Sequence, residues 1–204
     1  SGDWSSDVCS SDLLWLARMK QEDQYTYQHS MGCSIWTVAL GRQLGLGKSD
    51  LRTLAVGGLL FDVGKLKIDK SLLNNSRRLT EEEFEVVKRH VELGVESLRD
   101  GGVLNKDILD MAAYHHERHS GRGYPKGLVG NDIPVFARIA GIVDSYDAMT
   151  SQRAYAKPMS PSQAIKALYQ WRDVHFQAEL VEEFIQAIGL YPAGTLVELS
   201  SGEV

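Results

Sequence analysis

The feature that most constrains the fold is a helical spacing of apolar residues that runs from Leu13 to Leu190. Apolar residues recur at intervals of three and four, which places them on one face of an α-helix. Weak strand-like alternation is confined to residues 195–204. The spacing therefore predicts a single all-α domain with a small C-terminal β segment.

Start and stop signals divide this pattern into separate helices. One helix ends near Gly45, and Ser49-Asp50 can cap the next. Thr80 and Glu83 form a capping box, which opens a further helix. That helix is predicted to bury five apolar residues, namely Phe84, Val87, Val91, Val95 and Leu98. Other helices are expected from Lys106 to His115, from Pro134 to Met149, and over 160–172 and 177–188.

Residues 1–12 stand apart from the rest of the chain. They are rich in Ser and Asp, have no helical or strand period, and change abruptly into an apolar run. They also resemble the translation of a sequencing-adaptor oligonucleotide, so we interpret them as a scar and expect them to be extended or poorly packed. The domain is assigned to residues 13–204, truncated at both ends of a longer natural protein.

The composition excludes several classes of protein. With 43% hydrophobic and 24% charged residues the chain is typical of a globular domain. Its net charge of −5 provides no basic surface for nucleic acid. No apolar run approaches the roughly 20 residues that a membrane span needs, and no signal peptide is recognisable, so the cytoplasm is the expected compartment. Cys9 and Cys33 are too few for a disulfide framework.

Polar residues are densest between His115 and Pro125. Adjacent residues of a helix diverge by about 100°, so His115 and His116 can face one site only at the end of a helix. The turn around Gly121 and Gly123 supplies such an end. The alternative is an exposed histidine pair without a role.

Other polar residues lie within apolar segments. His29 is on the apolar stripe of its helix, His90 flanks another, and Asp62 follows a strongly apolar run. Asp144 and Asp147 are one turn apart in a helix that otherwise looks like core. Each residue alone has a structural explanation, such as a hydrogen-bonded core histidine or an aspartate facing water. Taken together, imidazoles and carboxylates are ligands for Mn, Fe or Zn, and two such ions can clamp both oxygens of a phosphodiester.

The order of these residues resembles the HD-GYP phosphohydrolases. The matching positions are His29-Ser30, Asp62, Gly64-Lys65, His90, His115-His116-Glu117-Arg118, Gly121, Gly123-Tyr124-Pro125, Asp144, Asp147-Ala148, Arg153 and Tyr155. The intervals are also similar to those of the family, with 32 residues from His29 to Phe61, 28 from Asp62 to His90, and 28 from His116 to Asp144. The resemblance covers the chain from about residue 14 to its end.

This resemblance implies an HD-domain-type helical bundle with the HD-GYP extension. It implies hydrolysis of cyclic di-GMP to pGpG or GMP, with cyclic di-GMP and proteins of its signalling as partners and the oligomeric state left open. Two divalent ions, Fe, Mn or similar, would be held by His29, Asp62, His90, His115, His116 and Asp144.

The resemblance also implies roles for residues around the ions. Asp62 would bridge the two ions, while Lys65 and Asp147 would orient water and neutralise a phosphate oxygen. These three are the candidate catalytic residues. Lys65, Tyr124 and Arg153 are the candidate substrate-binding residues, because a lysine or arginine can hold a phosphate.

The chain departs from the family pattern at two positions. Phe61 stands where the family has the histidine of its HD pair, and Ser120 stands where it has an aspartate. Since a phenyl ring offers no lone pair, we expect the first metal position to be weak. Three readings follow: an active phosphodiesterase with a weakened site, a module that binds the dinucleotide or a protein without turnover, and a hydrolase of another phosphorylated substrate.

Overall fold

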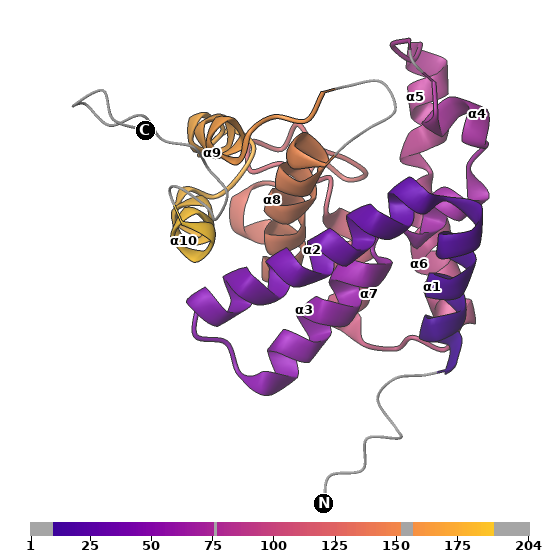
Figure 1. The fold of residues 1–204 in the computed structure, drawn as a ribbon, viewed down its shortest axis with the longest axis horizontal. Helices are drawn as coiled ribbons and strands as arrows, with labels where there is room; N and C mark the ends of the chain where they lie inside the picture. Colours follow the sequence, from indigo (N-terminus) through magenta and orange to yellow (C-terminus); the bar gives the residue numbers. More distant parts are fainter. Residues whose placement is uncertain (1–9, 76, 152–156, 190–204) are drawn as a thin grey trace, which may run out of the picture.

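The computed structural model describes residues 10–75, 77–151 and 157–189. Within these ranges the chain forms ten α-helices and two short 3-10 helices, and no β-sheet (Figure 1). None of these helices is both long enough and apolar enough to cross a membrane. The predicted all-α architecture is confirmed, whereas the predicted C-terminal β segment, residues 195–204, lies outside the described residues.

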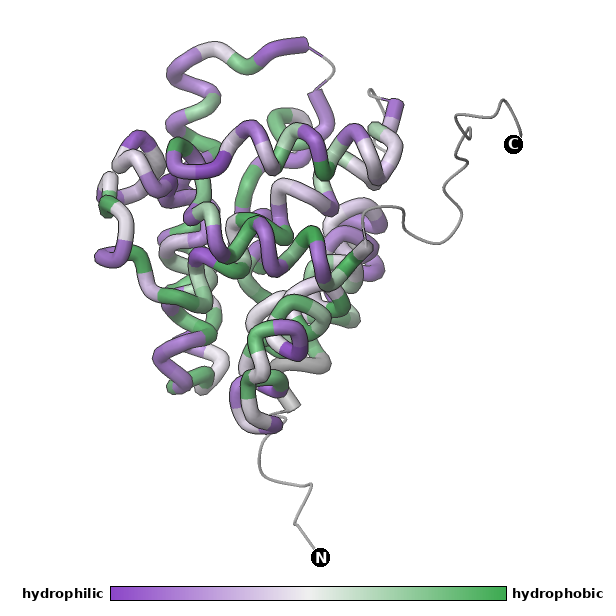
Figure 2. The backbone as a smooth tube through the Cα atoms, turned by 90° about the vertical axis from the view of Figure 1, so that its left-hand side faces the viewer, coloured by the Kyte–Doolittle hydropathy of each residue, from purple (hydrophilic) through white to green (hydrophobic). Residues whose placement is uncertain are grey.

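Helices from both halves of the chain form the core. Helix α2 (Gln24–Gln43) crosses the molecule and packs against α3 (Lys48–Leu60), α8 (Val135–Thr150) and α10 (Ala178–Ile188) (Figure 1). Hydrophobic and hydrophilic residues alternate in short stretches along the helices (Figure 2). This alternation gives each helix one face to bury, which is the pattern that the sequence predicted.

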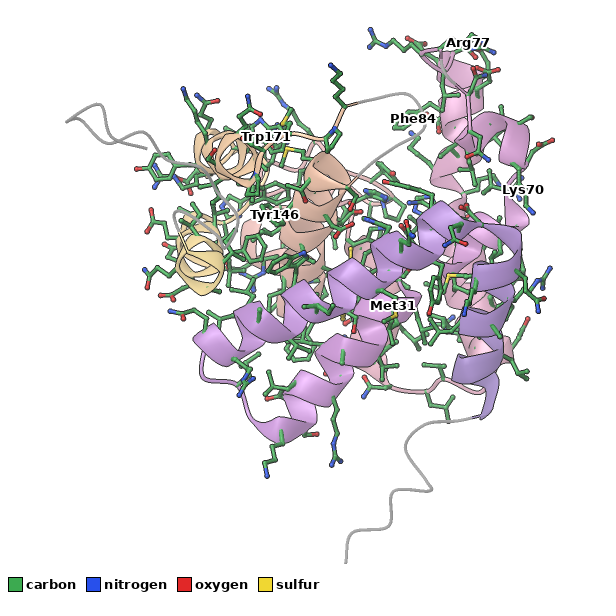
Figure 3. All side chains as sticks on the ribbon, in the orientation of Figure 1. Met31, Lys70, Arg77, Phe84, Tyr146 and Trp171 are labelled. Atoms are coloured by element: carbon green, nitrogen blue, oxygen red, sulfur yellow. The ribbon has the colours of Figure 1, made fainter. Side chains whose placement is uncertain are left out.

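Three aromatic rings connect α2, α8 and α10. Trp36 meets Tyr146 edge to face with ring centroids 5.5 Å apart, and Tyr146 meets Phe184 in the same way at 5.2 Å. Figure 3 labels Tyr146 in this region, between α8 and α10. Edge-to-face pairs add specific attraction to the burial of the rings, so they fix how these helices pack.

The remaining elements surround this core. They are α1 (Ser10–Glu22), η1 (Val63–Lys67), α4 (Lys70–Leu73), α5 (Glu81–Lys88), α6 (His90–Asp100), α7 (Lys106–Tyr114), η2 (Gly130–Asp132) and α9 (Pro161–Gln170). Helix α7 packs against α3 and α8, and α6 packs against α7 and η1. The end of α3, the start of α6 and the end of α7 thereby meet near His29, in the first half of α2.

Helix α1 begins inside the segment that we excluded from the fold. Residues 10–12 belong to α1, so the prediction that residues 1–12 are extended is wrong for these three. Residues 1–9 lie outside the described residues, and the assignment of the domain to residues 13–204 stays a prediction.

The helix that follows the Thr80 capping box is broken where the sequence predicted one continuous helix. The capping box is present, but α5 ends at Lys88 and α6 begins at His90. At the junction the N–H of Arg89 donates to the Val86 carbonyl, only three residues earlier, and the His90 ring bonds to the Val87 carbonyl. These bonds replace the regular helical pattern and redirect the chain.

Two other expectations at helix ends are corrected. Phe84 was predicted to be buried, but it is 45% exposed, because the break at residue 89 separates α5 from the buried face of α6. The N-cap of α3 is Gly47 and not the predicted Ser49, so the helix begins two residues earlier than expected. Extended backbone at Gly47 needs no side-chain oxygen to begin the helix.

Gly58 provides a test of the close packing between α2 and α3. A Cβ atom at residue 58 would lie 2.7 Å from Ser34 Cα, a backbone atom that cannot move alone. Gly58→Ala should therefore lower the free energy of unfolding by about 1–3 kcal/mol, as overpacking does. Urea denaturation followed by circular dichroism measures this.

Gly94→Ala is the matched control, because its Cβ would meet no atom closer than 3.4 Å in a helix. It should leave stability unchanged or raise it, since alanine favours the helix. Equal stability losses in both variants would contradict the packing account.

Candidate metal centre

The structure brings the six predicted ligand residues together from five parts of the chain. His29 lies in α2, Asp62 follows α3, His90 opens α6, His115 and His116 follow α7, and Asp144 lies in α8. Their donor atoms form two groups that share one residue. The first group is His29, Asp62 and Asp144, and the second is Asp62, His90, His115 and His116.

Asp62 is the shared residue, and its two oxygens face different groups. Oδ1 is 3.4 Å from His90 Nε2 and 3.5 Å from His115 Nε2. Oδ2 is 3.6 Å from His29 Nε2 and 2.5 Å from Lys65 Nζ. Burial alone would raise the pKa of Asp62, but Lys65 and the neighbouring histidines hold that pKa well below its usual range. An ionised carboxylate therefore stands between the two groups.

Gly64 allows this arrangement, because the backbone of η1 lies against α6. A Cβ atom at residue 64 would be 1.9 Å from the His90 carbonyl oxygen and 2.5 Å from the Gly94 backbone nitrogen. Only a glycine permits this approach, which brings Asp62 and Lys65 close to His90. The Gly-Lys pair that the sequence singled out thus has a steric role as well as an electrostatic one.

The second group has buried polar atoms that no protein group satisfies. Among the described residues, Asp62 Oδ1, His90 Nε2 and His115 Nε2 have no hydrogen-bond partner. The other ring nitrogens do have partners, since His90 Nδ1 is 2.7 Å from the Val87 carbonyl oxygen and His115 Nδ1 is 3.0 Å from that of Met111. A carbonyl only accepts, so Nδ1 carries a proton in both rings, and Nε2 keeps a lone pair wherever the imidazole is neutral.

The charge state of the second group follows from its burial. Burial lowers the pKa of His90 to about 4, against the attraction of Asp62, and lowers the pKa of His116 well below its ordinary value. A neutral His90 thus directs the lone pair of its Nε2 towards an ionised carboxylate. Such an arrangement is unfavourable unless a cation lies between these atoms. The donors fit a divalent metal ion.

The charges in the first group are arranged differently, because its histidine is paired with carboxylates. His29 Nδ1 is 2.7 Å from Asp147 Oδ2, and His29 Nε2 is 3.1 Å from Asp144 Oδ1. Burial lowers the pKa of His29, but contacts with Cys33, Asp144 and Asp147 outweigh it and hold the pKa well above 6.5. The ring is therefore protonated and paired with carboxylates on both sides. A metal ion at this group would have to displace that proton.

Phe61 lies between the histidines of the two groups. Its side chain is fully buried, and its ring centroid is 4.7 Å from that of His115 and 6.3 Å from that of His29. The phenyl ring contributes packing but no lone pair. The ring lies closer to His115 of the second group than to His29 of the first, so the expectation that it fills the space of the first metal stays a prediction. The first group has three donor residues among those described.

The loop after His116 is shaped by Glu117 and two glycines. The Glu117 carboxylate accepts from the backbone N–H groups of Lys126 and Leu128, at 2.7 and 2.9 Å. A Cβ atom at Gly123 would lie 2.4 Å from the Arg118 nitrogen, and Gly121 has a positive φ of 77°. These constraints hold the loop against the end of α7, where both histidines can face the centre.

Two features of the site were not predicted from the sequence. Asp147 contacts His29, and its second partner is the Ser151 hydroxyl at 2.9 Å. Its role in orienting water stays a prediction. Cys33 Sγ lies 3.6 Å from His29 Nε2, one helical turn further along α2. The spacing of four residues from His29 to Cys33 was the available signal. Arg153 lies outside the described residues.

Comparisons with known proteins agree with this geometry. The sequence profile of the HD domain matches residues 7–180. A cyclic di-GMP phosphodiesterase of Pseudomonas aeruginosa is 39% identical over 192 residues, which cover 94% of this chain and 46% of the relative. A 3'3'-cGAMP-specific phosphodiesterase of Vibrio cholerae is 34% identical over 162 residues, which cover 79% of this chain and 31% of the relative. The chain thus spans less than half the length of these relatives.

Solved structures share the fold at low sequence identity. An HDG"Y"P protein from Bdellovibrio bacteriovorus has a TM-score of 0.66 at 19% identity, over 84% of this chain and 56% of that one. The HD domain of the L. monocytogenes phosphodiesterase PgpH, in complex with cyclic di-AMP, has a TM-score of 0.60 at 19% identity. That match covers 85% of this chain and 92% of the other. It shows that the helices are arranged alike.

Asp147→Asn tests the role of the carboxylate beside His29. The amide keeps the size of the side chain but loses its charge, so it should weaken binding of Mn²⁺ at the first group by about 10- to 100-fold. Isothermal titration of the metal-free protein measures this. Ser151→Ala removes only the neutral hydrogen bond to Asp147 and should have little effect. Unchanged binding in Asp147→Asn would show that Mn²⁺ binding does not depend on the Asp147 carboxylate.

Proposed function

The chain belongs to the HD-GYP group of the HD domain family, and we propose that it hydrolyses cyclic di-GMP to pGpG or GMP at the metal centre described above. The order of the motif residues supports this, as do the phosphodiesterase activities that the names of its relatives state. The observation on which the proposal chiefly depends is the buried group of Asp62, His90 and His115, whose facing atoms have no partner among the described residues. In a packed core, buried polar atoms without partners would only lower the stability of the fold.

The ligand residues would hold two divalent ions, Fe, Mn or similar. His90, His115 and His116 would hold one, His29 and Asp144 the other, and Asp62 would bridge them. When bound, such ions activate water as a nucleophile and stabilise charge on the attacked and leaving oxygens of a phosphodiester.

The protein's own groups would position the reactants. The ammonium of Lys65 is 2.5 Å from Asp62 Oδ2, and attraction to Asp62 and Asp144 outweighs burial and raises its pKa, so it stays charged. It can therefore neutralise a non-bridging phosphate oxygen. Asp147 holds the His29 ring in place through Nδ1. Tyr124, next to His116, and Arg153 would contact the substrate.

We further propose that Phe61 weakens the first metal position. Its buried ring lies beside His115 and His29 and would leave no room for a further ligand or water on that side. The second group, with three imidazoles and Asp62, would then bind its ion more tightly. If the first position stays empty, the chain would bind cyclic di-GMP or a protein partner without turnover. This is the second candidate function, and the presence of Phe61 favours it.

Replacing Phe61 separates these two functions. Phe61→His should raise the metal content of the purified protein towards two ions per chain and increase turnover of cyclic di-GMP, because it adds an imidazole beside the first group. His115→Ala should instead lower metal content and abolish activity. Metal analysis by mass spectrometry and chromatography of the nucleotide products measure both effects.

Phe61→Leu is the matched control, since leucine is apolar and has no lone pair. It should change neither metal content nor turnover in the direction of Phe61→His. Two ions per chain in the unaltered protein, with no gain from Phe61→His, would refute the weakened site. Turnover by the unaltered protein would exclude the binding module.

A further inference from the structure

Three side chains form a cluster at the edge of the metal centre. Phe84 and Lys88 come from α5, and Tyr124 comes from the loop after His116. The rings of Phe84 and Tyr124 meet edge to face with centroids 6.0 Å apart. The Lys88 ammonium lies 5.4 Å from the Phe84 centroid and 5.6 Å from that of Tyr124. We call these three residues the ring platform; a cation beside two aromatic rings is a favourable arrangement.

The ring platform touches the metal centre through Tyr124. The Tyr124 ring stacks on His116, with centroids 4.7 Å apart and planes 25° apart. His116 belongs to the second donor group. A molecule bound at Phe84 and Lys88 would therefore lie two ring contacts from the donors that we assign to the metal. One ligand molecule could therefore contact Phe84 and Lys88 and also place a phosphate at the metal centre.

Phe84 is placed for contact with a ligand and not for core packing. It is 45% exposed, and Figure 3 shows it on the side of α5 that faces the middle of the molecule. Tyr124 meets this ring edge to face and Lys88 lies over it, and the part of the ring that stays exposed can contact a ligand. An exposed aromatic face next to a polar centre suits a flat aromatic ligand, because stacking buries both surfaces.

Lys88 can change partners. Its ammonium is 2.5 Å from Glu85 Oε1, but Glu85 is 68% exposed, and ion pairs at exposed positions are weak. A ligand that stacks on Phe84 and offers hydrogen-bond acceptors can therefore recruit the Lys88 ammonium without a large cost. The cation beside the rings makes the platform selective for ligands with acceptors at their edge.

We propose that the ring platform binds one guanine base of a cyclic dinucleotide, with the base stacked on Phe84 and Lys88 donating to its O6 and N7 acceptors. Guanine has both acceptors on this edge, whereas adenine has a donor amino group in place of O6. The platform therefore favours cyclic di-GMP over cyclic di-AMP, and it gives α5 a role in choosing the substrate. This inference rests on the proposed function, and it adds which residues would recognise a guanine base of that substrate.

Binding measurements test the platform separately from turnover. Isothermal titration with cyclic di-GMP and cyclic di-AMP would compare the unaltered protein with Phe84→Ala and Lys88→Met. Phe84→Ala should weaken binding of both dinucleotides about tenfold, because it removes the stacking surface. Lys88→Met keeps the length of the side chain, and it should reduce the preference for cyclic di-GMP over cyclic di-AMP by roughly fivefold or more.

Val86→Ala is the matched control on the same helix. Val86 is an exposed apolar residue, 42% accessible, and its substitution should leave the affinity for both dinucleotides unchanged. Turnover of cyclic di-GMP, measured in parallel, should show the effect of Phe84→Ala in KM with a smaller change in kcat. A change confined to kcat would contradict a role in binding the base.

The possible outcomes separate the two ideas. Binding that weakens in Phe84→Ala in a protein without turnover would support the platform and refute the proposed hydrolysis. Turnover with equal affinities in the unaltered protein, Phe84→Ala and Lys88→Met would refute the platform and leave the hydrolysis standing. A protein that binds neither dinucleotide would overturn both.

Discussion

The buried carboxylate of Asp62 is the constraint on which the rest of the site depends. Taking an ionised group out of water costs several kcal/mol unless opposite charges or hydrogen bonds compensate. Lys65 compensates on one oxygen, while the other faces the lone pairs of His90 and His115. The helices α2, α3, α6, α7 and α8 each bring a residue to or beside this carboxylate, so the bundle gathers its polar groups around one buried charge.

Much of this architecture could be predicted from the sequence. The period of apolar residues and the capping box at Thr80 gave most helix boundaries within a few residues, because both depend on local interactions. The six ligand residues could be assembled because their spacing matched a known family. The same spacing says which residues meet but nothing of their charge, and the protonated state of His29 needed the distances to Asp144 and Asp147.

The rest depended on interactions that spacing does not encode. The break between α5 and α6 coincides with a ring-to-backbone bond of His90, and a periodic pattern of valines gives no sign of it. The same periodic pattern predicted that Phe84 is buried. It is exposed, because α5 ends at Lys88 and does not continue the buried face of α6. The contact between Gly64 and the backbone of α6 joins residues 26 to 30 positions apart, and only the folded chain reveals it.

The junction at Arg89 has a mechanical consequence. The Val87 carbonyl that fixes the His90 ring belongs to α5, while His90 itself is the first residue of α6. Any swing of α5 about this junction must also move the oxygen that sets the orientation of the His90 imidazole. Phe84 and Lys88 ride on that same helix. A ligand that displaces Phe84 or Lys88 would therefore also shift the carbonyl that orients the buried His90 ring.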